Sequence, residues 1–333
     1  MNRLLGVQYL RAVAALGVVA FHAAERAGGH FVIGAAGVDI FFVVSGFIMW
    51  VIAEIRHPTP AAFLRDRVER IAPAYWIATG VMVAGGLAGL FPNMRLTAFH
   101  VFGSLAFLPH RSPSDGQIWP VLVQGWTLNY ELFFYVLFAF VLMLAAGRRL
   151  LVLACLFAGL IAAGLLLQPQ DAVLMTYTSP LLLEFLLGCC IGKLWLEGRI
   201  PTAMTGMALI VSAVVGFAFV GVTYSGFNAF ILGPLAGALL IGVLVLEKSG
   251  FMPRVASAGY LGDASYSIYL WHTMAISVVA KLGAVLSWPP SITFGMAVVC
   301  GTAVGLAAYE LLEKPIAAFF KSRRHRRERR LVI

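Results

Sequence analysis

Residues 34–54 read GAAGVDIFFVVSGFIMWVIAE, and Asp39 is the only charged residue of this run before Glu54. A helix needs about 20 mostly apolar residues to cross the hydrocarbon core of a bilayer. The run is continuous and shows no strict alternation of apolar and polar residues, which favours a helix over a barrel strand. The stretch therefore predicts a transmembrane helix.

Similar runs recur along the chain, which is 61% hydrophobic and only 12% charged. Soluble domains carry about 25% charged residues, so this composition excludes a soluble enzyme, a disordered chain and a small disulfide scaffold. We predict an all-α membrane protein, a polytopic bundle with a membrane domain over 1–318 and a basic tail over 319–333. The ten predicted spans lie at about 5–26, 34–54, 73–91, 125–146, 150–167, 178–196, 203–222, 228–247, 264–285 and 291–313.

The net charge of +9 is concentrated in segments that this topology places on one side. Basic residues gather on the cytoplasmic side of membrane proteins, which predicts that both termini are cytoplasmic. The basic run at 321–330 suits anionic lipid headgroups better than nucleic acid. Of the 24 Lys and Arg residues, the outer side receives Arg26, Arg95, Arg111 and Lys281.

Two ionisable residues, Arg11 and His22, lie within the first predicted span. Such residues are costly at membrane depth and are functional candidates for that reason. They are eleven residues apart, so they share one helix face and lie roughly 16 Å apart along its axis. Arg11 is then on the cytoplasmic side and His22 is towards the outside. One long molecule that lies along this helix face could contact both residues.

Carboxylates are predicted in the outer halves of other spans. Asp39 and Glu131 lie near the expected depth of His22, and the sequence leaves open which of them orients its imidazole. Glu184 is a third outer-half carboxylate, whereas a second membrane histidine, His272, is expected nearer the cytoplasm. The Ser-Gly pair that contains Ser45 is more typical of close helix packing than of catalysis.

A pair of arginines, Arg67 and Arg70, precedes Pro73, where the third span is expected to begin. They are neighbours on a helix face at the predicted cytoplasmic mouth. Guanidinium groups form bidentate contacts with phosphate oxygens. On spacing alone, a role as topology-setting flanking charges or in ion pairs with Asp66 and Glu69 is favoured over phosphate binding.

The cysteines offer no metal site or disulfide framework, because all four lie in apolar runs without CxxC spacing. They are Cys155, Cys189, Cys190 and Cys300.

Arg11 followed by ten residues and His22 resembles the first-helix signature of the acyltransferase type 3 family of integral membrane acyltransferases. The resemblance covers about residues 5–318 and is most similar to the exopolysaccharide acetylase branch. Further blocks appear in the family's order: Phe41-Phe42-x-x-Ser45-Gly46-Phe47, Arg67-x-x-Arg70-Ile71-x-Pro73-x-Tyr75-Trp76, Trp126-Thr127-Leu128-x-x-Glu131-x-x-Phe134-Tyr135, Ser265-Tyr266-Ser267-Ile268-Tyr269-Leu270-Trp271-His272 and Glu313-Lys314-Pro315.

The resemblance implies transfer of an acyl group, often acetyl, from acyl-CoA to a hydroxyl of a carbohydrate or lipid-linked sugar, without a permanently bound cofactor. It implies that His22 is the general base, with Asp39 or Glu131 beside it. Donor binding is expected of Arg11, Arg67 and Arg70. Substrate binding is expected of Ser45, Trp126, Tyr135, Tyr266 and His272.

Other interpretations of the same residues stay open. Direct transfer is favoured over an acyl-enzyme at His22, and an acyl-Ser45 intermediate is disfavoured because the sequence places no base beside it. A proton-coupled exporter of a lipid or sugar conjugate would also have many spans and membrane carboxylates. It would more often show two related halves, which this sequence lacks. A non-catalytic assembly subunit is the third class.

Overall fold

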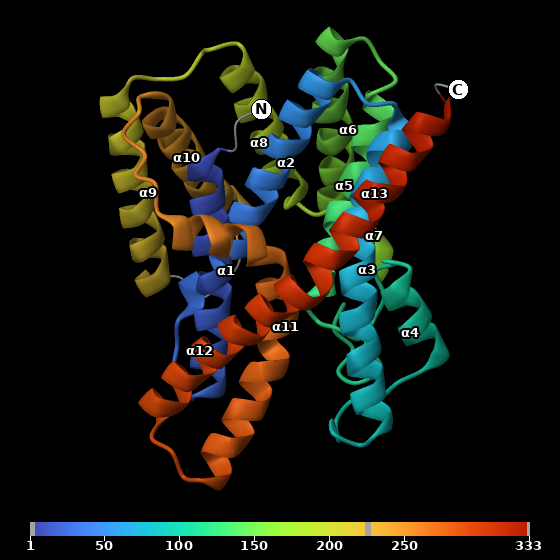
Figure 1. Ribbon diagram of the computed structural model, residues 1–333, viewed down its shortest axis with the longest axis vertical. Helices are drawn as coiled ribbons and strands as arrows, with labels where there is room; N and C mark the ends of the chain where they lie inside the picture. Colours follow the sequence, from blue (N-terminus) through green and yellow to red (C-terminus); the bar gives the residue numbers. More distant parts are fainter. Residues whose placement is uncertain (1–3, 224–227, 332–333) are drawn as a thin grey trace.

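The computed structural model describes residues 4–223 and 228–331, with side chains as far as Arg323. These residues form helices and loops without a β-strand (Figure 1). A 3₁₀ turn at Val32–Ala36 precedes α2, and a π-helical turn at Tyr309–Glu313 joins α12 to α13. The helices are α1 Leu5–Arg26, α2 Gly37–Arg56, α3 Pro60–Leu87, α4 Ala98–Leu105, α5 Gly125–Val141, α6 Ala146–Leu167, α7 Ala172–Tyr177, α8 Leu182–Leu196, α9 Ala203–Thr223, α10 Ala229–Lys248, α11 Ala256–Val285, α12 Pro290–Ala308 and α13 Lys314–Leu331.

The prediction of a helical, multi-pass membrane protein is confirmed. Every predicted span coincides with a helix, and eight helical segments of the described chain are long and apolar enough to cross a membrane. The predicted third and fourth spans fall outside these eight. The reason is that α3 carries a charged stretch in its first half, and α5 is a shorter apolar helix. A total of ten spans stays a prediction.

The helix that contains the predicted third span begins well before Pro73. Helix α3 begins at Pro60, where the Thr59 side chain caps it by accepting a hydrogen bond from the backbone N–H of Ala62. A Thr cap followed by proline is a favourable helix start, and Pro73 lies inside the helix without ending it. The charged segment 65–70 is therefore part of a long helix and not a loop before one.

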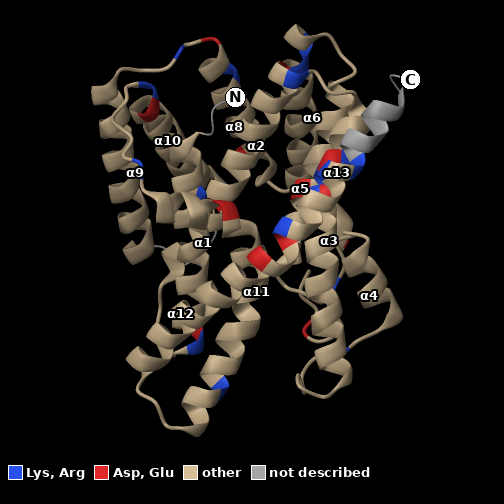
Figure 2. Ribbon diagram, in the orientation of Figure 1, with Lys and Arg blue, Asp and Glu red and all other residues tan. Residues whose placement is uncertain are grey.

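Basic side chains gather at one end of the bundle. In Figure 2 most Lys and Arg residues lie in the upper half, at the end where α1 begins and α2 ends. There Arg149, near the start of α6, forms a 2.8 Å ion pair with Glu54 near the end of α2. This asymmetry is the one that the sequence predicts for the cytoplasmic side.

Glycines allow the central helices to cross closely. A Cβ atom on Gly46 of α2 would collide with the carbonyl oxygen of Phe185 in α8, and one on Gly188 of α8 would collide with that of Val43. Glycine at such crossings lets two backbones approach within a membrane. Gly46 therefore packs α2 against α8, while the preceding residue, Ser45, lines a cavity.

We expect Gly46→Ala to lower the free energy of unfolding by about 1–3 kcal/mol, because overpacking forces the two backbones apart. The measurement is thermal or denaturant unfolding of the purified protein in detergent micelles. Gly80→Ala in α3 is the matched control, because a Cβ atom there has nothing within 4 Å. Equal stability of the two variants would contradict the close crossing.

Candidate active site

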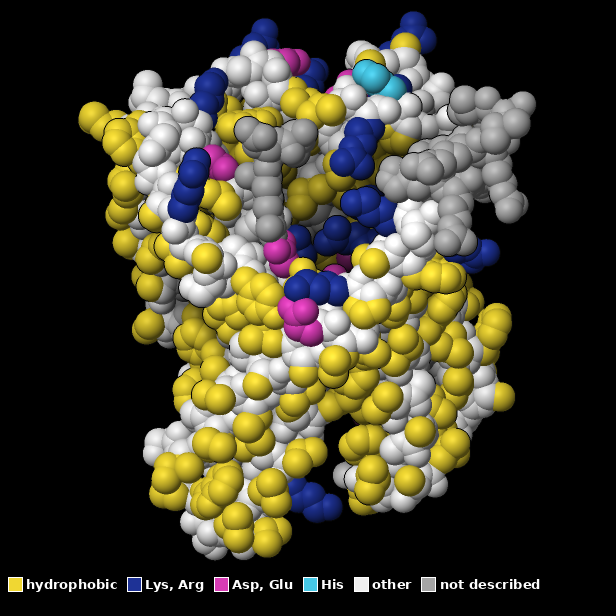
Figure 3. Space-filling view, viewed as in Figure 1, with side chains coloured by type: hydrophobic (Ala, Val, Ile, Leu, Met, Phe, Trp, Pro, Cys, Tyr) yellow, Lys and Arg dark blue, Asp and Glu magenta, His cyan; other side chains and the backbone are white. Residues whose placement is uncertain are grey.

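A cavity of about 450 Å³ lies among α1, α2, α3, α5 and α11. In Figure 3 dark blue Lys and Arg side chains gather in a hollow below the basic end of the molecule. The lining reaches Leu4 and Arg56, at the start of α1 and the end of α2. The residues of this cavity that the sequence singled out are Arg11, Arg67, Arg70, Ser45, Glu131, Tyr135 and Tyr266. We call it the donor cavity, after the sequence prediction that its arginines bind the acyl donor.

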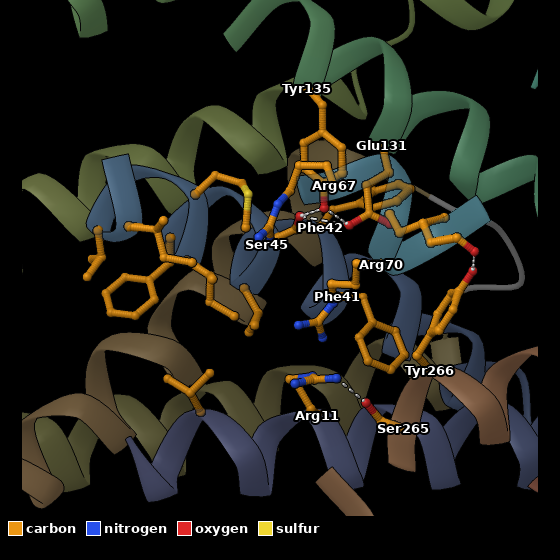
Figure 4. Close-up of a pocket in the computed structure, with 18 of the residues that line it drawn as sticks. Arg11, Phe41, Phe42, Ser45, Arg67, Arg70, Glu131, Tyr135, Ser265 and Tyr266 are labelled. Carbon is orange, nitrogen blue, oxygen red and sulfur yellow. Dashed lines mark hydrogen bonds between the residues drawn. The ribbon is translucent and has the colours of Figure 1, made fainter. Parts of the chain in front are cut away.

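The three arginines reach this cavity from two helices. Arg11 is only 9% exposed and donates a 2.8 Å hydrogen bond from Nη2 to Oγ of Ser265 in α11. Arg11 and Arg70 point toward one another from opposite walls in Figure 4. Neither Arg67 nor Arg70 forms an ion pair with a carboxylate in the part of the chain that the structure describes, and Nε of Arg67 is buried without a hydrogen-bond partner there.

The expected place of the arginine pair at the cytoplasmic mouth stays a prediction. Because α3 begins at Pro60, Arg67 and Arg70 lie roughly 10 and 15 Å along the helix from its start. Arg65 of the same helix points elsewhere and lies 3.9 Å from both Asp66 and Glu69. The pair thus lines the donor cavity and forms no ion pair there with a described carboxylate.

Glu131 joins two hydroxyl groups in the same cavity. Ser45 donates a 3.0 Å hydrogen bond to Oε1 of Glu131, and the Tyr135 hydroxyl donates to the same oxygen (Figure 4). The prediction that Glu131 could orient His22 is therefore wrong. So is the view that Ser45 has no base nearby, because the rotation of α5 about its axis, which sequence spacing does not determine, turns Glu131 towards α2.

His22 lines a different cavity, of about 580 Å³, together with Glu25, Gln124 and Thr273. Its Nδ1 lies 3.1 Å from Oε2 of Glu25. A carboxylate only accepts hydrogen bonds, so Nδ1–H donates and Nε2 of the neutral ring is left as an acceptor. The carboxylate beside His22 is thus Glu25, one helical turn away in α1. The i,i+3 spacing in the sequence could have revealed it.

His272 lies beside His22, and not nearer the basic end of the bundle as the sequence suggested. Its ring centroid is 5.3 Å from that of His22, so the two histidines lie at one level. The expectation that it lies nearer the cytoplasm fails because α11 begins at Ala256 and places His272 near its middle. Nδ1 of the buried ring donates to the carbonyl of Ile268 at 2.9 Å, and Nε2 has no partner in the described part of the chain. It lines neither cavity.

Asp39 is fully buried at the start of α2 and lies against Glu184 at the start of α8. Within the described residues, the oxygens of both carboxyl groups have no other hydrogen-bond partner. Asp39 lines neither cavity and does not pair with His22, so that prediction is wrong. The α2–α8 crossing turns Asp39 towards α8 and away from α1.

Trp126 also lies away from both cavities. Its ring packs edge-on against Trp119 and Tyr130, with centroids 6.2 and 5.8 Å apart. The side chain therefore packs the start of α5, and its expected role in substrate binding stays a prediction.

A hydrogen-bonded partition separates the two cavities. On the donor side, Tyr269 bonds to the Thr127 hydroxyl at 3.0 Å and donates to the backbone carbonyl of Gln124 at 3.2 Å. On the His22 side, Nε2 of Gln124 donates to Oγ1 of Thr273 at 2.7 Å. The sequence did not single out Gln124 or Thr273, because one polar residue beside an apolar run carries no distinctive spacing.

The family model described as an acyltransferase domain matches residues 4–310. The chain belongs to the acyltransferase type 3 family. This family assignment confirms the resemblance on which the sequence prediction rests, and the match covers the helices that build both cavities.

Individual relatives of this acyltransferase cover most of its length. It is 55% identical to the exopolysaccharide production protein ExoZ of Rhizobium meliloti (strain 1021), over 91% of this chain and 96% of that protein. It is 30% identical to the putative membrane-bound transacylase BcsY of Komagataeibacter xylinus, over 84% of this chain and 75% of BcsY. The peptidoglycan O-acetyltransferase OatA of Listeria monocytogenes is 24% identical over 82% of this chain, which spans about half of OatA. No solved structure matches this chain significantly.

The geometry of this acyltransferase separates two chemical environments. The donor cavity offers three guanidinium groups, which suit phosphate oxygens; Arg11 is buried, Arg67 is half-buried and Arg70 is exposed. The second cavity offers an imidazole with a free nitrogen, which suits proton abstraction. Among the described residues, no group of three or more His, Cys, Asp or Glu side chains is arranged to hold a metal ion.

Proposed function

We propose that this protein transfers an acyl group from acyl-CoA to a hydroxyl of a polysaccharide or of a lipid-linked sugar. The acyl group that we assign to it is acetyl. The observation that carries the donor assignment is the donor cavity, where Arg11, Arg67 and Arg70 converge. The names of relatives support the acceptor class, since ExoZ is an exopolysaccharide production protein and OatA a peptidoglycan O-acetyltransferase.

The positive charge of the cavity favours an anionic ligand, because Arg11, Arg67 and Arg70 outnumber the one carboxylate of its described lining, Glu131. Uncompensated positive charges are costly in a membrane, and a ligand that carries phosphates would neutralise them. CoA carries several phosphate groups on a long, flexible arm that ends in the thioester. The donor cavity extends towards Arg56 at the basic end of the bundle, which we assign to the cytoplasm, where acyl-CoA is found. The protein then lies in the bacterial inner membrane with both termini inside.

His22 is proposed as the general base of a direct transfer. Its Nδ1–H is engaged by Glu25, so Nε2 can take the proton from the acceptor hydroxyl as the oxygen attacks the thioester carbonyl. The new C–O bond forms, the C–S bond breaks, and the CoA thiolate leaves and receives the proton from the imidazolium. Glu25 holds the ring and stabilises its positive charge. Arg11 and His22 are roughly 16 Å apart along α1, so the donor must extend from its phosphate site as far as the partition.

The direct test uses the purified protein in lipid nanodiscs with isotopically labelled acetyl-CoA. The acceptor is a partial hydrolysate of the exopolysaccharide made by the producing cell. We expect free CoA to be released in proportion to label that appears on the oligosaccharides by mass spectrometry. Label that never reaches the glycan, in a preparation that binds acetyl-CoA, would contradict the proposed acceptor class.

A further inference from the structure

The second cavity, which His22 lines, has two chemically different sides. Its volume of about 580 Å³ is within the usual range for sites that bind small molecules. A sugar ring has hydroxyl groups around its edge and apolar C–H groups on its faces, so it fits a cavity with one polar and one apolar wall. The polar wall, from α1 and α11, contains His22, Glu25, Arg26, Thr273 and Ser277, with the apolar Met274 and Ile276 of α11 beside them. The apolar wall contains Met82, Phe91, Met94, Leu122 and Val123.

Gln124 lines this cavity, and only the nitrogen of its side-chain amide has a hydrogen-bond partner among the described residues. The side chain is 4% exposed, and its Nε2 donates to Oγ1 of Thr273. Its Oε1 is buried without a hydrogen-bond partner among the described residues. Buried amide oxygens in folded proteins are rarely left unpaired, so a ligand hydroxyl that donates to Oε1 would satisfy this group.

Gln124 lies between the donor cavity and the cavity that contains the proposed base, His22. Its backbone carbonyl accepts the Tyr269 hydroxyl that faces the donor cavity, while its side chain shares the second cavity with His22. A sugar held by Gln124 is thus beside both the proposed base and the partition.

We propose that the second cavity is the binding site for the acceptor sugar, and that Gln124 and Thr273 bind its hydroxyl groups while His22 deprotonates the one that reacts. This inference rests on the proposed function. Donor and acceptor then occupy separate cavities on the two sides of the Tyr269–Gln124 partition. Neither has to leave before the other binds, so the initial-rate kinetics are sequential and not ping-pong.

The test compares two glutamine variants in lipid nanodiscs, with labelled acetyl-CoA as donor. The acceptor probes are the exopolysaccharide hydrolysate and methyl β-glucoside. We expect Gln124→Leu to raise the acceptor KM about tenfold and to leave the donor KM unchanged. Gln8→Leu is the matched variant in the donor cavity, where Gln8 contacts Arg11, and it should raise the donor KM alone. Thr273→Val is a second variant of the acceptor site if Gln124→Leu does not fold.

Three results would overturn the inference. One is an unchanged acceptor KM in folded Gln124→Leu and Thr273→Val. The second is a raised donor KM in Gln124→Leu, as in Gln8→Leu. The third is a set of parallel double-reciprocal plots for the wild type. Failure of the proposed function looks different, because the wild-type protein itself would then transfer no label from acetyl-CoA to any glycan.

Discussion

Replacing His22 with alanine is expected to reduce kcat for acyl transfer by about 10²–10⁴-fold, the usual contribution of a general base. The reason is that only Nε2 of this ring is free to accept a proton in the His22 cavity, since Nδ1 is held by Glu25. The donor cavity is lined by other residues, so acetyl-CoA should bind as it does to the wild type. The measurement is label transfer by purified protein, together with titration of acetyl-CoA binding.

The control for this substitution is His30→Ala, because His30 is exposed in the loop after α1 and lines neither cavity. It should retain wild-type turnover. If His22→Ala also retained near wild-type kcat while correctly folded, His22 would not be the base.

Replacing Arg67 or Arg70 with alanine is expected to raise the donor KM by about 10–100-fold, because hydrogen bonds to charged groups contribute about 1.5–3 kcal/mol each. Both side chains line the donor cavity and form no ion pair with a carboxylate among the described residues. The acceptor KM should change little, since the acceptor is assigned to the other cavity. Initial rates at varied acetyl-CoA and fixed acceptor measure the effect.

Arg65→Ala provides the matched control on the same helix. Arg65 is half exposed and lies beside Asp66 and Glu69, and it is absent from the cavity lining. Its loss should leave the donor KM unchanged. A donor KM that stayed constant in both Arg67→Ala and Arg70→Ala would argue against a phosphate site here.

Helical periodicity predicted relations within one helix correctly. Arg11 and His22 share one face of α1, as their spacing requires, and both face α11: Arg11 bonds to Ser265, and His22 packs beside His272. The length and apolar character of each run likewise predicted where the helices lie, because a span needs a minimum number of apolar residues whatever surrounds it.

Relations between helices could not be predicted in the same way. Residue spacing determines where a side chain lies on its own helix, but the rotation and depth of that helix against its neighbours depend on how side chains interlock at each crossing. Asp39, Glu131 and His22 therefore looked equivalent in depth, although they belong to three different sites. Asp39 meets Glu184, Glu131 meets Ser45, and His22 meets Glu25.

The sequence by itself thus determined a helical membrane protein, its family, and the residue types that could bind an anionic donor and move a proton. Only the tertiary structure decided that the arginines and His22 line two cavities separated by the Tyr269–Gln124 partition. The physical reason is that a cavity forms where several helices fail to fill the space between them. That space depends on their relative rotation and on close contacts such as Gly46 against α8, which no single run of residues specifies.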